Sequence, residues 1–249
     1  MTTPLEALWA GPVSIAGHDG DTIPAYLSTP AGDSSRGSVV VIHHMPGFDS
    51  ATLEITRRFA ALGYAAICPN LHHRDNPGGG PDEAAAASRA AGGVPDARLV
   101  GDVAGAVDHL KSLPESNGKV GVIGYCSGGR QAFLVGCELD VDAVVDCCGA
   151  FIVGAPPEAV GLTIPPLIQL ASKLSAPMLG LFGADDTYPA KDEVDELESV
   201  LTRLGKDVDF HILDGAGHAF FAVDRPNYRP EAACYGWTLI DEFFGKHLR

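Results

Sequence analysis

Short apolar segments alternate along the chain with longer segments of helical periodicity. The apolar segments, many of them rich in Val, Ile and Leu, predict strands at residues 38–44, 65–68, 119–123, 141–145, 177–182 and 207–213. Apolar residues that recur every three or four positions predict helices at residues 50–62, 97–113, 127–137, 191–204 and 231–247. Because strands alternate with helices, we expect a three-layer α/β fold with a mostly parallel central sheet and helices on both faces.

Two regions depart from this alternation. The first thirty residues are expected to form an antiparallel hairpin that leads into the sheet. Residues 70–95 contain a run of three glycines, several prolines and an alanine run at 84–87. Long irregular insertions often serve as lids or binding loops, and the alternative here is a disordered surface loop with a short helix. We therefore predict a single domain over residues 1–249, with a candidate lid or binding loop at 70–95.

Composition and charge narrow the classes of function. The chain has 17 Lys and Arg against 32 Asp and Glu, a formal net charge of −15. Such a surface repels nucleic acids and anionic membranes, so neither is expected as a partner, although the charge could simply serve solubility. The sequence contains no signal-peptide pattern and no run of roughly 20 apolar residues. These features predict a cytoplasmic protein.

One of the six cysteines stands in a distinctive setting. No CxxC pair is present, so no metal site is expected, and buried reduced thiols are the plain interpretation for the other five. Cys126 lies in Gly124-Tyr125-Cys126-Ser127-Gly128, between a predicted strand and a predicted helix. This is the pattern of a nucleophile on a tight turn, and the helix N-terminus behind it favours a thiolate. The alternative is a tight turn that buries an inert cysteine.

A carboxylate and a histidine follow later strands in the order that such a nucleophile requires. Asp185 and Asp186 come directly after the strand at 177–182, and His218 follows the strand at 207–213. Carboxyl ends of parallel strands meet at one edge of the sheet, where ligands bind. We predict Asp186 as the acid, with Asp185 as the alternative. His218 is the predicted base, although a capping or surface histidine would have a similar sequence.

These residues define an expected mechanism. Cys126 attacks a carbonyl carbon to form an acyl-enzyme, which water then hydrolyses. His218 takes the proton from the thiol, or holds the thiolate as an ion pair, and Asp186 orients the imidazole. The oxyanion is expected to bind the amide of Ser127 and the amide of Met45, which lies in the loop after an early strand.

The motifs resemble those of the dienelactone hydrolase family over nearly the whole chain. The matching segments are GYCSGG at 124–129, SNGKVGVIGYC at 116–126, GAGHAF at 215–220 and HHMPGFD at 43–49. The resemblance implies an α/β-hydrolase fold with Cys126, Asp186 and His218 in the triad. It implies hydrolysis of a small ester or lactone such as carboxymethylenebutenolide, without a metal or organic cofactor. A monomer or homodimer is expected.

Two positions depart from that family's pattern. His44 stands where the family's reference enzymes carry a glutamate that helps ionise the thiol, and we expect it to contact the thiol or to be a packed strand-end histidine. Arg74 matches one of two arginines that bind a substrate carboxylate, and it is otherwise a surface residue. The second arginine is absent, with Ala222 near its place. Tyr125 is expected to bind the substrate as well.

Other functions remain as alternatives at this point. A broad carboxylesterase or a thioesterase could use the same residues, because specificity depends on loops. A binding protein that kept the fold would need no triad. A redox thiol at Cys126 would need a resolving cysteine, and Cys147 and Cys148 follow a neighbouring strand.

Overall fold

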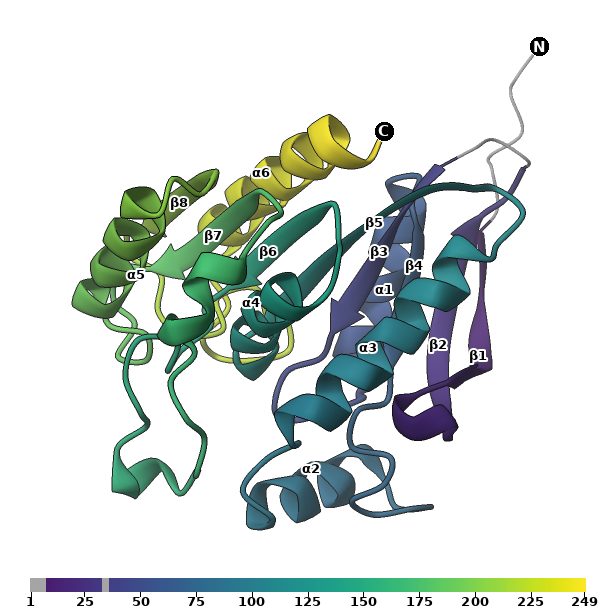
Figure 1. Ribbon diagram of the computed structural model, residues 1–249, viewed down its shortest axis with the longest axis horizontal. Helices are drawn as coiled ribbons and strands as arrows, with labels where there is room; N and C mark the ends of the chain where they lie inside the picture. The colour runs from purple at the N-terminus through teal and green to yellow at the C-terminus, as the bar shows by residue number, and fades with distance from the viewer. Residues whose placement is uncertain (1–7, 33–35) are drawn as a thin grey trace.

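The protein is built on an eight-stranded sheet in the computed structural model, which describes residues 8–32 and 36–249 (Figure 1). In chain order the strands are β1 (Leu8–Ala16), β2 (Thr22–Pro30), β3 (Arg36–Ile42), β4 (Ala65–Pro69), β5 (Ser116–Tyr125), β6 (Ala143–Cys147), β7 (Met178–Gly183) and β8 (Val208–Leu213). Their order in the sheet is β1-β2-β4-β3-β5-β6-β7-β8. β1 and β2 form the predicted antiparallel hairpin, β2 is antiparallel to β4, and every other pair is parallel. The predicted α/β fold with a mostly parallel sheet is confirmed.

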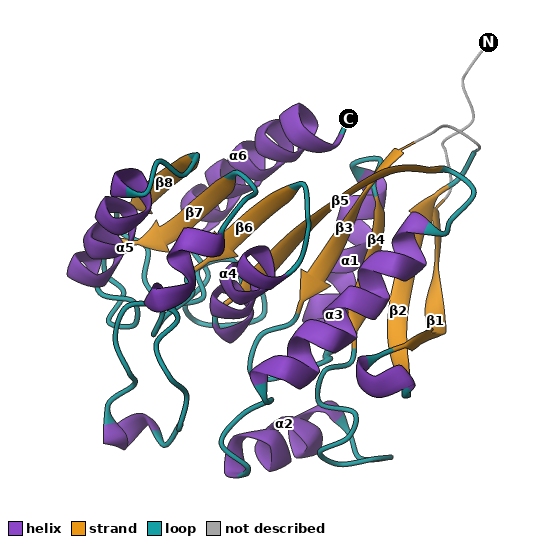
Figure 2. Ribbon diagram, in the orientation of Figure 1, coloured by secondary structure: helices purple, strands orange, loops and turns teal. Residues whose placement is uncertain are grey.

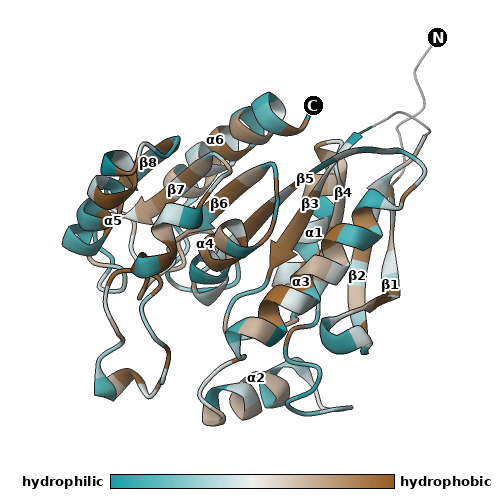
Figure 3. Ribbon diagram, in the orientation of Figure 1, coloured by the Kyte–Doolittle hydropathy of each residue, from teal (hydrophilic) through white to brown (hydrophobic). Residues whose placement is uncertain are grey.

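Helices cover both faces of this sheet (Figure 2). On one face lie α3 (Asp96–Lys111), α4 (Ser127–Glu138) and α5 (Lys191–Arg203), and on the other lie α1 (Ser50–Ala61) and α6 (Pro230–Leu248). Successive side chains of a strand point alternately into the core on one face of the sheet and into the core on the other face. Val120 and Val122 pack under α3 and α4, whereas Ile123 packs under α6. Apolar residues accordingly gather on the strands and on the inward sides of the helices (Figure 3).

Several predicted boundaries shift for identifiable reasons. Asn117 and Gly118, which precede the predicted strand at 119–123, lie inside β5, where the register against β3 changes between Arg36 and Ser38. Gly118 has a φ of 85°, so the pair forms an irregularity in the strand instead of a chain reversal. β3 ends at Ile42, which leaves the two following histidines in a loop.

The segment at 70–95 is more regular than predicted and contains α2 (Pro81–Ala90). Pro81 occupies the first turn, where its missing N–H costs nothing, and the Gly80 amide donates to Glu83 Oε2 at 3.1 Å. Three short 3₁₀ helices complete the fold: η1 (His18–Gly20), η2 (Glu158–Val160) and η3 (Ile168–Lys173). α2 and the loop that carries η2 project past the same edge of the sheet (Figure 1).

A helix that crosses a bilayer must be both long and apolar, and this applies to every helix in the described ranges, 8–32 and 36–249. None of them meets both requirements for crossing a membrane.

Candidate active site

Cys126 lies on a strained turn between β5 and α4. Its φ of 56° and ψ of −122° fall where a residue with a side chain is rarely found, which costs about 1–3 kcal/mol. The turn is tight on both sides. A Cβ on Gly124 would overlap the carbonyl oxygen of Gly128, and a Cβ on Gly128 would overlap that of Ile42. Glycine is therefore required at both positions, and the turn lifts the thiol out of the sheet.

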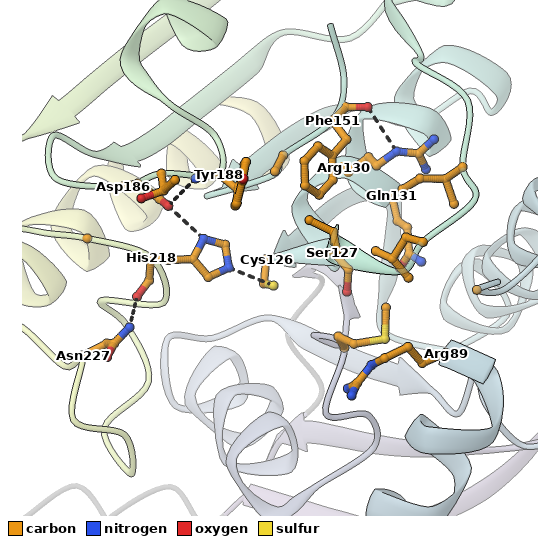
Figure 4. A pocket seen from close by; sticks show the side chains of 18 of the residues that line it. Arg89, Cys126, Ser127, Arg130, Gln131, Phe151, Asp186, Tyr188, His218 and Asn227 are labelled. Atoms are coloured by element: carbon orange, nitrogen blue, oxygen red, sulfur yellow. Dashed lines mark hydrogen bonds and ion pairs between the residues drawn. The ribbon is translucent and has the colours of Figure 1, made fainter. Parts of the chain in front are cut away.

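His218 and Asp186 complete a hydrogen-bonded chain from this thiol (Figure 4). His218 Nε2 lies 3.0 Å from Cys126 Sγ, and His218 Nδ1 lies 2.9 Å from Asp186 Oδ2. The other oxygen of Asp186 accepts the Tyr188 amide at 2.9 Å. Asp186 is buried, whereas Asp185 is exposed, so it is Asp186 that meets the imidazole.

A hydrogen bond to the backbone of His218 also fixes its position. Its carbonyl oxygen accepts a hydrogen bond from Asn227 Nδ2 at 2.9 Å (Figure 4). Sequence reasoning did not identify Asn227, because it lies nine residues away in an irregular loop without a recognisable motif. With both ring nitrogens and the carbonyl oxygen engaged, the imidazole has a fixed orientation toward the sulfur.

The charge state of His218 follows from its two partners. Burial by itself lowers the pKa of the imidazole, but the hydrogen bonds and charges of Asp186 and Cys126 outweigh it and raise the pKa to about 10. At neutral pH the ring is therefore an imidazolium. Its Nε2 lies 3.0 Å from the sulfur of Cys126, within hydrogen-bonding distance.

A cavity of about 790 Å³ opens in front of the thiol. Its lining comes from the loop after β3, the end of α2, the start of α4, the loop after β6 and the loops after β7 and β8. Met45 and Ser127, the predicted oxyanion residues, both line it together with Cys126. The predicted lid segment contributes His72, Arg89, Gly93 and Val94 to the wall. That this segment moves stays a prediction.

His44 has a partner other than the thiol. Its Nε2 lies 2.7 Å from Asp49 Oδ2, and Asp49 also caps α1 by accepting the Thr52 amide. Burial raises the pKa of Asp49, but its hydrogen bonds with His44 and Thr52 outweigh this and lower it to about 2. His44 lines a smaller cavity of about 110 Å³ that also touches Cys126. The expected hydrogen bond from His44 to the thiol is not formed, because Asp49 holds the ring.

Tyr125 faces away from the large cavity. It packs in the core under α6, with its ring 5.5 Å from the ring of Phe221. Its hydroxyl is buried without a partner, and burial raises the pKa of the phenol well above its ordinary value. Tyr125 lines the smaller cavity instead. The prediction that Tyr125 contacts a substrate in front of the thiol is therefore wrong for the large cavity.

Arg74 is also absent from the large cavity. Its guanidinium forms a two-pronged pair with Asp102, with N–O distances of 2.7 and 3.1 Å, and a third contact of 2.9 Å with Asp21. Asp102 on α3 is fully buried and also accepts the His18 amide. The guanidinium neutralises this buried carboxylate, so the prediction that Arg74 binds a substrate is wrong.

This arrangement predicts a structural phenotype for Arg74. Arg74→Ala should lower the free energy of unfolding by about 3 kcal/mol, because it leaves the Asp102 charge buried without its partner. The KM for an ester substrate should not change. Urea denaturation and steady-state kinetics measure the two effects. Lys191→Ala is the control, since its pair with Asp195 is exposed and should contribute less than about 1 kcal/mol. A raised KM with unchanged stability would contradict this assignment.

Sequence reasoning missed three arginines that line the large cavity, namely Arg89, Arg130 and Arg229. Arg130 lies on α4, one turn after the nucleophile, and is buried. It donates to the carbonyl oxygens of Phe151 at 3.4 Å and Pro165 at 2.6 Å. A charged residue in the first turn of the helix after the elbow was the signal that could have identified it.

The two thiols at the end of β6 differ from Cys126 in their surroundings. Cys147 and Cys148 are buried, and burial raises the pKa of both thiols well above the ordinary value. Such thiols stay protonated at neutral pH and are weak partners for thiol exchange. Within the described ranges, no group of three or more His, Cys, Asp or Glu side chains is arranged to hold a metal ion.

The chain is similar in sequence and fold to known proteins. The profile of the "Dienelactone hydrolase family" matches residues 23–248. A Methylorubrum extorquens protein provisionally named a carboxymethylenebutenolidase is 31% identical over 255 residues, covering 99% of this chain and 84% of that protein. The carboxymethylenebutenolidase of Pseudomonas sp. strain P51 is 28% identical, covering 88% of each. A crystal structure from Klebsiella pneumoniae, provisionally named a dienelactone hydrolase, is 28% identical with a TM-score of 0.86, covering 97% of this chain and 100% of that chain.

Proposed function

Because the chain belongs to the dienelactone hydrolase family, whose members hydrolyse ester or lactone bonds, we propose that it cleaves a small ester or lactone through a thioester on Cys126. The observation that carries this proposal is the hydrogen-bonded chain from Cys126 Sγ through His218 to Asp186, which borders the large cavity. The thiolate–imidazolium pair supplies both a nucleophile and a proton donor before any substrate binds.

Acylation uses both members of the pair. The thiolate attacks the carbonyl carbon, a carbon–sulfur bond forms, and the carbonyl oxygen becomes an oxyanion near the amides of Ser127 and Met45. The carbon–oxygen bond to the alcohol then breaks. The imidazolium of His218 gives its Nε2 proton to the leaving oxygen, so the alcohol departs neutral and the imidazole becomes neutral. In a lactone the released hydroxyl stays attached to the acyl group.

Deacylation restores the starting state. Neutral His218 takes a proton from a water molecule, and the resulting hydroxide attacks the thioester carbon. The carbon–sulfur bond breaks, the carboxylic acid leaves, and the thiolate and imidazolium are formed again. Asp186 keeps Nδ1 protonated throughout, because its Oδ2 accepts that hydrogen bond at 2.9 Å. No external oxidant or cofactor is needed for the atoms and charges to balance.

Trapping of the intermediate tests this proposal directly. Rapid acid quenching during turnover of p-nitrophenyl acetate should yield protein heavier by one acetyl group, and peptide mapping should locate that group on Cys126. The acetyl group should be released by hydroxylamine at neutral pH, as a thioester is. The Cys148→Ala variant should form the same adduct, because that thiol is buried and protonated. An acetyl group on any other residue, or turnover without an adduct on Cys126, would contradict the proposal.

The redox alternative predicts that no acetyl group is trapped on Cys126 during incubation with p-nitrophenyl acetate. A sensor thiol would react with hydrogen peroxide and leave esters intact. The buried, protonated state of Cys147 and Cys148 argues against a ready resolving partner. Esterase and thioesterase activities remain compatible with the same thioester chemistry, since they differ only in the leaving group.

A further inference from the structure

The geometry of the triad divides the large cavity into two sides. During acylation the leaving oxygen must come within about 2.6–3.2 Å of His218 Nε2 to receive its proton. The oxyanion occupies a second direction from the reacting carbon, toward Ser127. The acyl substituent must therefore point away from His218. Figure 4 shows His218 on one side of Cys126 and the side chains of Phe151 and Gln131 on the other.

Most of the apolar side chains in the cavity wall come from the loop after β6, which also carries Phe151. We call the following residues the acyl wall: Val94, Phe151, Val160, Leu162 and Ile164. Val94 is buried, and the other four are half-buried while lining the cavity. The two segments of this wall meet, since a Cβ added to Gly93 would lie 3.8 Å from Ile164 Cγ2. Half-buried aliphatic side chains on a long loop offer apolar area to a ligand.

The loop that supplies most of this wall is held firmly at both ends. Arg130 donates to the carbonyl oxygens of Phe151 and Pro165, and the Ile152 amide donates to Glu193 Oε1 at 3.2 Å. Two of the Arg130 nitrogens are thus engaged by the protein's own backbone. The buried Arg130 therefore positions the loop. The other two arginines of the cavity wall, Arg89 and Arg229, are exposed to solvent.

We propose that the acyl wall is a binding site for the acyl group of the substrate, and that it selects esters of apolar carboxylic acids longer than acetic acid. This inference rests on the proposed thioester chemistry at Cys126. A cavity of about 790 Å³ lies in the upper part of the range of about 300–1,000 Å³ found for sites that enclose drug-sized ligands. A compact acetyl group would leave the aliphatic side chains of the wall without a partner.

A series of p-nitrophenyl esters tests this selectivity because the leaving group stays constant. The value of kcat/KM should rise at least about 10-fold from acetate to hexanoate, since each buried CH₂ strengthens binding several-fold. An anionic acyl group of similar length, the adipate monoester, should be a poorer substrate than hexanoate. Alkyl acetates from ethyl to hexyl extend the alcohol instead, and their kcat/KM should change less than about 3-fold, because the alcohol leaves on the side of His218.

Variants of the wall locate the effect. Leu162→Ala with Ile164→Ala should lower the ratio of kcat/KM for hexanoate to kcat/KM for acetate about 10-fold. Thr163→Ala is the matched control, since Thr163 lies between them, is exposed and does not line the cavity. The control should behave like the wild type with both esters. Unfolding curves of the wild type, the double variant and the control check that the substitutions leave the fold intact.

The outcomes separate the two proposals. If Cys126-dependent hydrolysis occurs but acetate and hexanoate react equally, the acyl wall is overturned and the thioester chemistry stands. The same holds if the adipate monoester is preferred, or if alkyl acetates show the chain-length effect. If no ester is hydrolysed in a Cys126-dependent way, both proposals fail.

Discussion

Replacement of Cys126 by alanine is expected to lower kcat/KM for p-nitrophenyl esters by about 10⁴-fold or more. The thiol is the one group in the large cavity that is presented on a strained turn and hydrogen-bonded to an imidazolium. Its removal leaves His218 and Asp186 without a nucleophile to activate. The fold should be retained, and the turn should keep its strain, since alanine still carries the Cβ that makes this backbone conformation unfavourable.

Alkylation by iodoacetamide provides an independent measurement of the same thiol. One cysteine of the wild type should react rapidly at neutral pH, and that fast phase should be absent in Cys126→Ala. Cys234→Ala is the control, because Cys234 is exposed on α6 and lines neither the large nor the smaller cavity. It should keep both the fast phase and the esterase activity. Esterase activity that persists in Cys126→Ala would remove this thiol from the mechanism.

The elements that carry the chemistry could be predicted because their signals are local. Gly124 is required by a contact within the turn and Gly128 by the end of the neighbouring β3, and the two glycines on either side of Cys126 make the elbow visible in a few residues of sequence. Asp186 and His218 each follow a strand, and a parallel sheet brings those strand ends to one edge. Sequence reasoning favoured Asp186 over Asp185 without excluding either, and the structure pairs Asp186 with the imidazole.

The substrate side of the site could be predicted only in part. The strand period of two was sufficient to place Tyr125 with Ile123 in the core under α6, and that signal was not used. Arg74 is different, because its direction depends on a buried carboxylate on α3, 28 residues away. The loop of the acyl wall has no periodicity, and its shape follows from tertiary contacts such as those of Arg130. Distant contacts of this kind leave no pattern in one sequence.

Exchange of Asp186 for asparagine is expected to lower kcat/KM by about 10⁴-fold while the fold is kept. Asp186 accepts two hydrogen bonds, one from the Tyr188 amide and one from His218 Nδ1–H. Asparagine has a single carbonyl oxygen, and the fixed backbone donor of Tyr188 would take it. The side-chain amide would then donate toward Nδ1. The imidazole would carry its proton on Nε2 and could not accept one from the thiol or from water.

The same exchange should change the pH dependence. In the wild type, burial lowers the pKa of His218, but Asp186 and Cys126 raise it from 6.5 to about 10. The charged ring therefore stabilises the folded state fully below about pH 6.5, and this stabilisation is lost as the pH rises toward 10. Without Asp186, the alkaline fall of kcat/KM should move to lower pH. The free energy of unfolding should also depend less on pH within this window.

Kinetics and thermal unfolding across neutral and alkaline pH measure both effects. Asp185→Asn is the matched control, because this neighbouring carboxylate is exposed and lines the same cavity. It should keep kcat/KM within about 3-fold of the wild type, since no transition-state contact is lost. If Asp185→Asn lost the activity and Asp186→Asn kept it, the acid of the triad would be Asp185 and the assignment to Asp186 would be wrong. An unchanged alkaline limb in Asp186→Asn would mean that the charge of Asp186 does not hold the proton on His218.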